Sequence, residues 1–261
     1  MITVGDIAAT IESFAPCKLQ EAYDNAGLQV GDPTMQVSGV LLCLDVNETV
    51  LREAKHRCCN MVISHHPLLF GGVKQITPRN ERGRIVMEAI KEGIALYAAH
   101  TNLDRTWEGV SYEIARILGL KDVTVLCPDP ADPLKGLGIV GMTEPTPALS
   151  FLRKVKETFN VKCLRYSQTF PKLTLRRVAV CGGAGASLIR NAIDHGADVM
   201  LTGDLKYHDY TSYSGQILLA DIGHYESELC SRKIFARILR ERFPDLTVNL
   251  SEEETSPINC I

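Results

Sequence analysis

The sequence predicts an α/β protein made of two similar three-layer α/β domains, and three observations lead to this fold class. Apolar, strand-like runs alternate with amphipathic, helix-like segments along most of the 261 residues. The strand-like runs are apolar throughout, which is typical of parallel strands buried on both faces. The pattern of the first half also returns in the second half, as expected of a quasi-duplication.

The expected elements follow from apolar runs, helix caps and glycine stops. In the first half, strands are expected at 40–44, 61–64 and 94–99, and helices at about 47–57, 81–92 and 110–118. In the second half, strands are expected at 177–181, 198–202 and 217–221, and helices at 186–194 and from about His224 to Arg242. This alternation favours a largely parallel sheet in each half.

The two halves align at fixed offsets. An offset of 138 residues relates Cys43 to Cys181 and His66 to Asp204. An offset of 124 relates His100 to His224 and Asp104 to Glu228. Chance agreement of two α/β patterns is the alternative explanation, but the repeated His-x-x-x-(Asp/Glu) pattern favours a true repeat.

Two proline-rich stretches predict breaks in the chain. Residues 127–133 contain three prolines, which block helices and central strands alike, and 143–147 form a second break. We therefore predict a first domain from residues 1–126 and 224–261, and a second domain from residues 127–223.

Composition excludes several classes of protein. The net charge of −3 and the lack of a basic face indicate no clear nucleic-acid binding. No apolar run approaches the ~20 residues that a membrane helix needs, and the N-terminal residues do not resemble a signal peptide, so we expect a cytoplasmic protein. The nine cysteines are odd in number and include no C-x-x-C pair, which favours buried, reduced thiols over disulfides or a zinc knuckle.

Histidines follow three of the predicted strands, where an open parallel sheet binds its ligands. His65 and His66 end one strand, while His100 and His224 follow two others. A carboxylate stands four residues after each of the last two, namely Asp104 and Glu228. Each group alone has an ordinary structural explanation, as a core histidine, an ion pair or a helix cap. Together they form the imidazole and carboxylate set that divalent metals prefer, and there are enough of them for two ions.

The spacing also indicates how two metals could be shared. Adjacent side chains of a strand point to opposite sides, so His65 and His66 can both face one site only if the strand has just ended, which Pro67 favours. They are then expected to serve two different ions. His224 and Glu228 lie at i and i+4 of a predicted helix, and the two oxygens of Glu228 can bridge two ions. Ions bridged in this way lie about 3.5–4 Å apart and hold water that ionises near pH ~7.

Five motifs, in order along nearly the whole chain, make the sequence resemble the Nif-three-like proteins, also known as GTP cyclohydrolase 1 type 2 homologues. The motifs are Tyr-Asp-Asn-Ala-Gly-Leu-Gln-Val-Gly-Asp at 23–32, Ser-His-His-Pro at 64–67, His-Thr-Asn-Leu-Asp at 100–104, Thr-Gly-Asp-Leu-Lys-Tyr-His at 202–208 and Gly-His-Tyr-Glu-Ser-Glu at 223–228. The length matches a short form of the family without an inserted domain.

The resemblance implies a dinuclear metal centre in the cleft between two similar α/β domains, and a ring-shaped homohexamer. It implies that His66 and Asp104 bind one metal, that His65 and His224 bind the other, and that Glu228 bridges both. His100 becomes a nearby site residue. The metal can be zinc, iron, manganese, cobalt or nickel, because His/carboxylate sets accept all of them.

Two further segments are candidates for substrate contacts. The glycine-rich turn at 181–187 joins a strand to a helix, and either cradles a phosphate or forms a tight turn that needs positive φ. His208 and Asp204 follow a strand end, where they either face the site or lie in a surface loop.

The sequence therefore predicts a dinuclear metal-dependent hydrolase, similar to a type 2 GTP cyclohydrolase, that acts on a small molecule such as a nucleotide or related heterocycle. Metal-bound hydroxide is the expected nucleophile, and His100 or His208 is expected to move the proton. The alternative is a metal-binding regulatory or protein-interaction hexamer without turnover. Open coordination positions favour the enzyme, since structural metal sites are closed by protein ligands.

Overall fold

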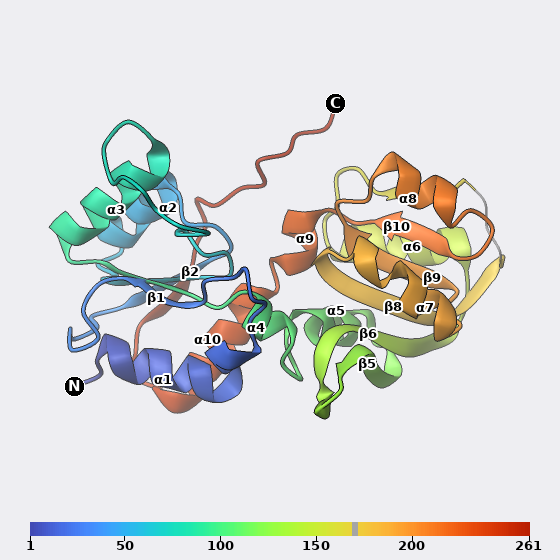
Figure 1. Cartoon of the computed structure of the whole chain (residues 1–261), viewed down its shortest axis with the longest axis horizontal. Helices are drawn as coiled ribbons and strands as arrows, with labels where there is room; N and C mark the ends of the chain where they lie inside the picture. The colour runs from blue at the N-terminus through green and yellow to red at the C-terminus, as the bar shows by residue number, and fades with distance from the viewer. Residues whose placement is uncertain (169–171) are drawn as a thin grey trace. The chain divides into compact units, whose positions relative to one another are not determined.

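The computed structural model describes residues 1–168 and 172–261, which form two compact units, each with its own sheet (Figure 1). The first unit comprises Met1–Leu103 and Ser231–Thr255, and the second comprises Asp104–Cys230 and Ser256–Ile261. The predicted α/β fold class is confirmed. None of the helices in the described residues is both long and apolar enough to cross a membrane.

The first unit has a five-stranded sheet in the order β1-β4-β3-β2-β11. The strands are β1 (Gly27–Val30), β2 (Val40–Cys43), β3 (Met61–Ser64), β4 (Ala95–Ala98) and β11 (Val248–Leu250). Neighbouring strands are parallel, except that β1 runs antiparallel to β4 at one edge. Every residue of β2, β3 and β4 is buried, as their continuous apolar runs predict.

Helices cover both faces of this sheet. They are α1 (Val4–Phe14), α2 (Glu48–His56), α3 (Glu81–Glu92) and α10 (Ser231–Arg242), with a short η1 (Cys17–Leu19) and α4 (Thr101–Asp104). Helices α2 and α3 pack together on one face, and α1 and α10 pack together on the other (Figure 1). As predicted, the Asn47 side chain caps α2, and Gly93 ends α3 with a φ of 64°.

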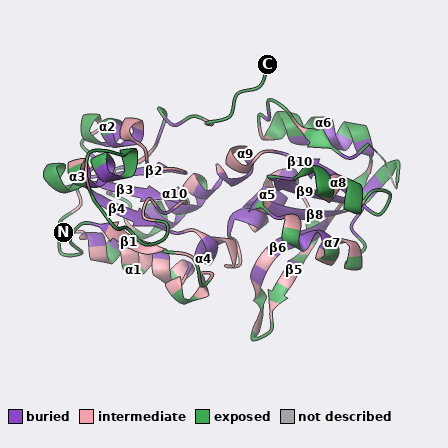
Figure 2. Cartoon of the chain, turned by 45° about the horizontal axis from the view of Figure 1, so that its top comes forward, coloured by how far each residue is buried: buried purple, intermediate pink, exposed green. Residues whose placement is uncertain are grey.

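The second unit has a six-stranded sheet in the order β5-β6-β8-β9-β10-β7. The strands are β5 (Lys121–Asp129), β6 (Asp132–Pro147), β7 (Arg165–Tyr166), β8 (Thr174–Ala184), β9 (Val199–Gly203) and β10 (Leu218–Asp221). The helices are α5 (Val110–Leu118), α6 (Ala148–Thr158), η2 (Ala186–Leu188), α7 (Ile189–Asp194), α8 (Tyr207–Ser212) and α9 (His224–Glu228). Figure 2 shows buried strands at the centre of each unit and exposed residues on the outer helices.

The predicted duplication is visible in the topology. The first sheet contains the order β1-β4-β3-β2 and the second contains β7-β10-β9-β8, with an antiparallel strand at the edge in both. Val40 lies opposite Met61 in the first unit, and Val178 lies opposite Val199 in the second. Both members of the second pair are displaced by the same 138 residues that the sequence comparison gave.

The structure differs from the sequence-based prediction at both proline-rich breaks, since 143–147 form the last part of β6. Residues 127–133 are no linker, because they form the hairpin between β5 and β6, and the edge position of β5 tolerates Pro128.

The boundaries of the two units also differ from the predicted domain boundaries. Residues 104–126 and 224–230, which the sequence predicts in the first domain, belong to the second unit. Helix α5, within 104–126, packs there on β6 and β8. The prediction of one C-terminal helix from His224 to Arg242 is also wrong, because α9 and α10 are separate helices that belong to different units.

The buried carboxylate of Glu53 in α2 holds the segment that follows β11. It accepts hydrogen bonds from Ser251 Oγ at 2.5 Å and from the amides of Glu252 and Glu253 at 3.0 and 3.2 Å, and it pairs with Arg57 at 2.9 Å. Burial alone would raise the pKa of Glu53, but these contacts outweigh it and lower the pKa below its usual 4.5.

We expect Glu53→Gln to lower the free energy of unfolding by about 2 kcal/mol at pH 7, because glutamine leaves buried donors without acceptors. A carboxylate with a lowered folded-state pKa stabilises the fold above its unfolded-state pKa, and this contribution is lost as the pH falls through the folded-state pKa. Urea unfolding should therefore show a gap between wild type and variant that narrows below pH 4.5. Glu253→Gln, at an exposed position of the same segment, is the control. A gap that does not depend on pH would contradict this assignment.

Candidate functional site

The first unit brings three histidines together beyond the carboxyl ends of β3 and β4. The ring centroids of His65, His66 and His100 lie 5.3 Å from one another in all three pairs. One ring nitrogen from each lies within 4.8 Å of the other two, which is close enough for a shared metal ion. His65 is fully buried, and the other two are partly buried. The structure thus brings these three predicted site residues together beyond the strand ends, and their roles stay a prediction.

Each of these imidazoles is anchored through Nδ1. The acceptors are Ala99 O for His65, Asp45 Oδ1 for His66 and Asp24 Oδ1 for His100, each at 2.8 Å. A carbonyl or an ionised carboxylate can only accept, so Nδ1 donates its proton here, and in the neutral imidazole Nε2 then carries the lone pair. This is the tautomer that a metal-binding histidine needs, with the outer hydrogen bond that normally orients such a ligand.

Asp24 is the most strongly bound of these anchors. Its side chain is 0% exposed, and its second oxygen accepts the amide of Thr101 at 3.0 Å as well as the Thr101 hydroxyl. Burial alone would raise its pKa, but the hydrogen bonds from His100 and Thr101 outweigh this and hold the pKa well below its usual range. Asp24 is therefore an ionised acceptor.

The second unit contributes a histidine and a carboxylate on one face of α9, as the i, i+4 spacing predicts. His224 Nε2 lies 2.9 Å from Glu228 Oε2, and the Glu228 side chain is only 5% exposed. His224 Nδ1 lies 2.8 Å from Asp204 Oδ2, so this imidazole has the same carboxylate anchor as His66 and His100. Asp204, which the offset of 138 residues relates to His66, therefore contacts one of the predicted site residues, His224.

The glycine-rich segment at the end of β8 leaves room for the Glu228 side chain. The amides of Gly182, Gly183 and Gly185 donate to the hydroxyls of Ser111, Ser227 and Thr202. Gly183 has a φ of +61°, and a Cβ there would lie 2.1 Å from Glu228 Oε1. These contacts favour the tight-turn interpretation over a phosphate cradle, because the protein's own hydroxyls occupy the amides.

The remaining predicted residues have distinct environments. Asp104 is the last residue of α4. Burial is the larger cause of the raised pKa of the Cys181 thiol, and the negative charges of Asp104 and Glu228 raise this pKa further, because both carboxylates lie near the thiol. Cys181 is buried, and all nine cysteines are free thiols. His208 is exposed on α8, with its ring 5.4 Å from that of Tyr207, and its catalytic role stays a prediction.

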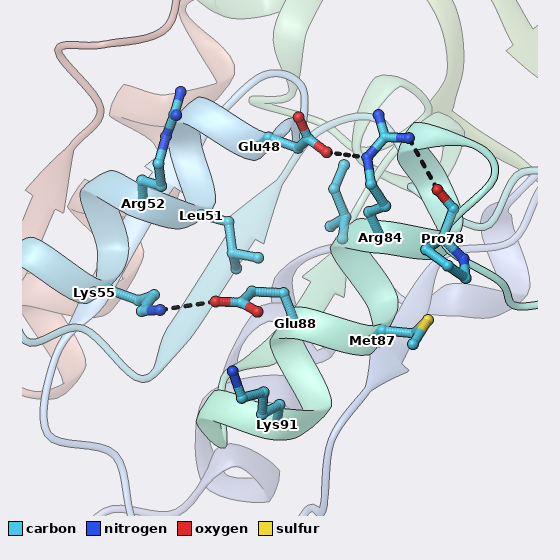
Figure 3. Close-up of a pocket in the computed structure, with 10 residues that line it drawn as sticks. Glu48, Leu51, Arg52, Lys55, Pro78, Arg84, Met87, Glu88 and Lys91 are labelled. Carbon is cyan, nitrogen blue, oxygen red and sulfur yellow. Dashed lines mark hydrogen bonds and ion pairs between the residues drawn. The ribbon is translucent and has the colours of Figure 1, made fainter.

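A groove away from these histidines lies between α2 and α3 (Figure 3). Its volume is about 570 Å³, and ion pairs join Lys55 to Glu88 and Arg84 to Glu48 across the two helices. None of the predicted site residues lines it, and its acidic groups are neutralised by the opposite helix. A smaller hollow of about 350 Å³ is lined by His66, Asp45 and Arg82 among others, and therefore borders the histidine cluster.

Comparison with known proteins accounts for nearly the whole chain. The sequence model of the Duf34/NIF3 (NGG1p interacting factor 3) family matches residues 2–257. A Clostridium perfringens protein named GTP cyclohydrolase 1 type 2 homolog is 34% identical over 261 residues, which cover 99% of each chain. A Lactococcus lactis protein of the same name is 34% identical, covering 97% of this chain and 98% of the relative.

Solved structures agree with this relationship. The crystal structure of a Bacillus cereus protein related to NIF3 matches with a TM-score of 0.91 and 25% identity, over 100% of this chain and 99% of that chain. A Staphylococcus aureus protein matches with the same TM-score and 26% identity, over 100% and 99% of the two chains. From the sequence matches and the fold together, the chain belongs to the Duf34/NIF3 family.

Proposed function

We propose that the protein is a hydrolase with two divalent metal ions, which acts on a nucleotide or a related heterocycle. The metal ligands in this proposal are His65, His66, Asp104, His224 and Glu228. The observation that carries it is the shared state of the histidines, each held at Nδ1 by an acceptor so that Nε2 is the ligating atom. The names of the curated relatives favour a guanine nucleotide as the first substrate to test.

The donor set fits an enzyme better than a structural metal site. Five protein ligands shared by two ions leave coordination positions for water and substrate. When bound, the ions supply Lewis acidity and a water that ionises near neutral pH. His100 is the residue we assign to proton transfer, because Asp24 fixes its Nδ1–H and leaves the lone pair of Nε2 among the imidazoles.

Elemental analysis of untagged protein, with GTP hydrolysis assayed on the same samples, tests this proposal. We expect about two metal ions per chain and release of a ring-opened or hydrolysed product. A protein that holds no metal even after reconstitution would contradict the proposal. About two ions without turnover would favour the alternative of a metal-binding regulatory protein. The homohexamer and the cytoplasmic location stay predictions from the sequence.

A further inference from the structure

Two exposed aromatic side chains stand beside the histidine cluster of the first unit. Tyr23 is 64% exposed and Phe70 is 44% exposed, although both are large and partly or wholly apolar. Their ring centroids are 6.2 Å apart with an interplanar angle of 66°, and the Phe70 ring lies 6.1 Å from that of His100. The Phe70 ring therefore stands next to both the Tyr23 ring and the imidazole of His100.

Hydrogen bonds hold the two loops that carry these rings. Asn25 Nδ2 donates to Leu69 O at 2.7 Å, and the amide of Leu69 donates to Gln29 Oε1 at 3.0 Å. The first bond joins the loop of Tyr23 to the loop of Phe70, and the second joins the loop of Phe70 to β1, across 44 and 40 residues of sequence. Asp24, the neighbour of Tyr23, is itself fixed by His100 and Thr101. The loop of Tyr23 is thus anchored through Asp24, the residue that also orients His100.

An exposed aromatic pair with a fixed geometry is suited to binding flat ligands. Aromatic rings attract other conjugated rings by offset stacking and by edge-to-face contacts. Because Tyr23 and Phe70 are steeply inclined to each other, a flat ring stacked on one of them meets the other with its edge. The neighbouring imidazole of His100 then lies at the border of the bound ring.

We propose that Tyr23 and Phe70 form the binding surface for the flat conjugated heterocycle of the substrate. The claim that this surface binds the substrate rests on the proposed function, whereas the claim that it binds flat aromatic rings does not. The surface binds ligands that carry a flat aromatic ring. A sugar or a phosphate alone lacks the π-face on which Tyr23 and Phe70 can stack. The ring is held next to His100, the residue assigned to proton transfer.

The test is the affinity of the purified protein for guanosine and for ribose 5-phosphate, measured by calorimetry. We expect Tyr23→Ala and Phe70→Ala each to weaken guanosine binding by about tenfold, the loss of one stacking contact. Tyr23→Phe should keep the affinity, because it keeps the ring. Tyr166→Ala is the matched control, since Tyr166 has the same 44% exposure as Phe70. Ribose 5-phosphate should bind all variants alike.

The outcomes separate this inference from the proposed function. Guanosine that fails to bind the wild type, or binds the alanine variants as tightly as the wild type, would overturn the inference. If guanosine binds through the two rings but the metal-loaded protein hydrolyses no nucleotide, the surface stands and the hydrolase proposal fails. If GTP is hydrolysed and Phe70→Ala leaves KM unchanged, the hydrolase stands and the surface is wrong.

Discussion

Glu228→Ala is expected to reduce the metal content from about two ions to less than one per chain and to lower any hydrolytic activity by at least about 10²-fold. Glu228 is the one carboxylate that the family resemblance assigns to both ions. Its side chain is almost fully buried and lies 2.9 Å from His224 Nε2, so in the variant water would have to enter a buried position to take its place. Elemental analysis and an activity assay on the same sample measure both effects.

Glu226→Gln is the matched control for this variant. Glu226 belongs to the same short helix, α9, but lies two positions away and therefore on a different face. It should keep both the metal content and the activity. Full metal occupancy in Glu228→Ala would remove Glu228 from the ligand set, and with it the bridge on which the dinuclear arrangement depends.

Gly183→Ala is expected to lower the free energy of unfolding by more than about 3 kcal/mol and to reduce metal binding at the same time. Two effects add at this position. The φ of +61° is unfavourable for alanine, and the new Cβ would stand 2.1 Å from Glu228 Oε1. The carboxylate or the turn must move, and either movement disturbs a proposed ligand.

Gly215→Ala separates the two effects. Gly215 has a φ of +75°, but no described atom lies within 4 Å of the position that its Cβ would take. It should therefore cost only about 1 kcal/mol and leave metal binding unchanged. Urea unfolding and metal titration of both variants measure the difference. Equal destabilisation by the two substitutions, with metal binding intact in Gly183→Ala, would show that the turn adjusts around the methyl group.

The parts of the fold that the sequence predicts correctly are those that depend on local patterns. Continuous apolar runs locate β2, β3, β4, β9 and β10, and Asn47 and Gly93 mark helix ends through their own backbone contacts. The hairpin at 127–133 could not be predicted in this way. Proline excludes a central strand, but whether a strand is central or at an edge depends on its neighbours in the sheet.

In the candidate site, too, local sequence patterns predict some of the residues and not others. His65 and His66 are adjacent in sequence, and His224 and Glu228 share a helix face, so spacing alone relates the members of each pair. The anchors of His66 and His100 are different, because Asp45 and Asp24 lie 21 and 76 residues away in the sequence. No periodic pattern relates such residues. The one signal in the sequence is the position of Asp24 in the motif at 23–32.

The anchoring of the imidazoles at Nδ1 has a consequence for handling the protein. Acceptors from the chain itself set the orientation of His65, His66, His100 and His224. Rotamer and tautomer are therefore chosen during folding, before any ion arrives. A chelator should strip the protein without unfolding it, and the resulting apoprotein should accept whichever divalent ion is offered. The ion found in a purified sample would then record the medium in which the cells grew.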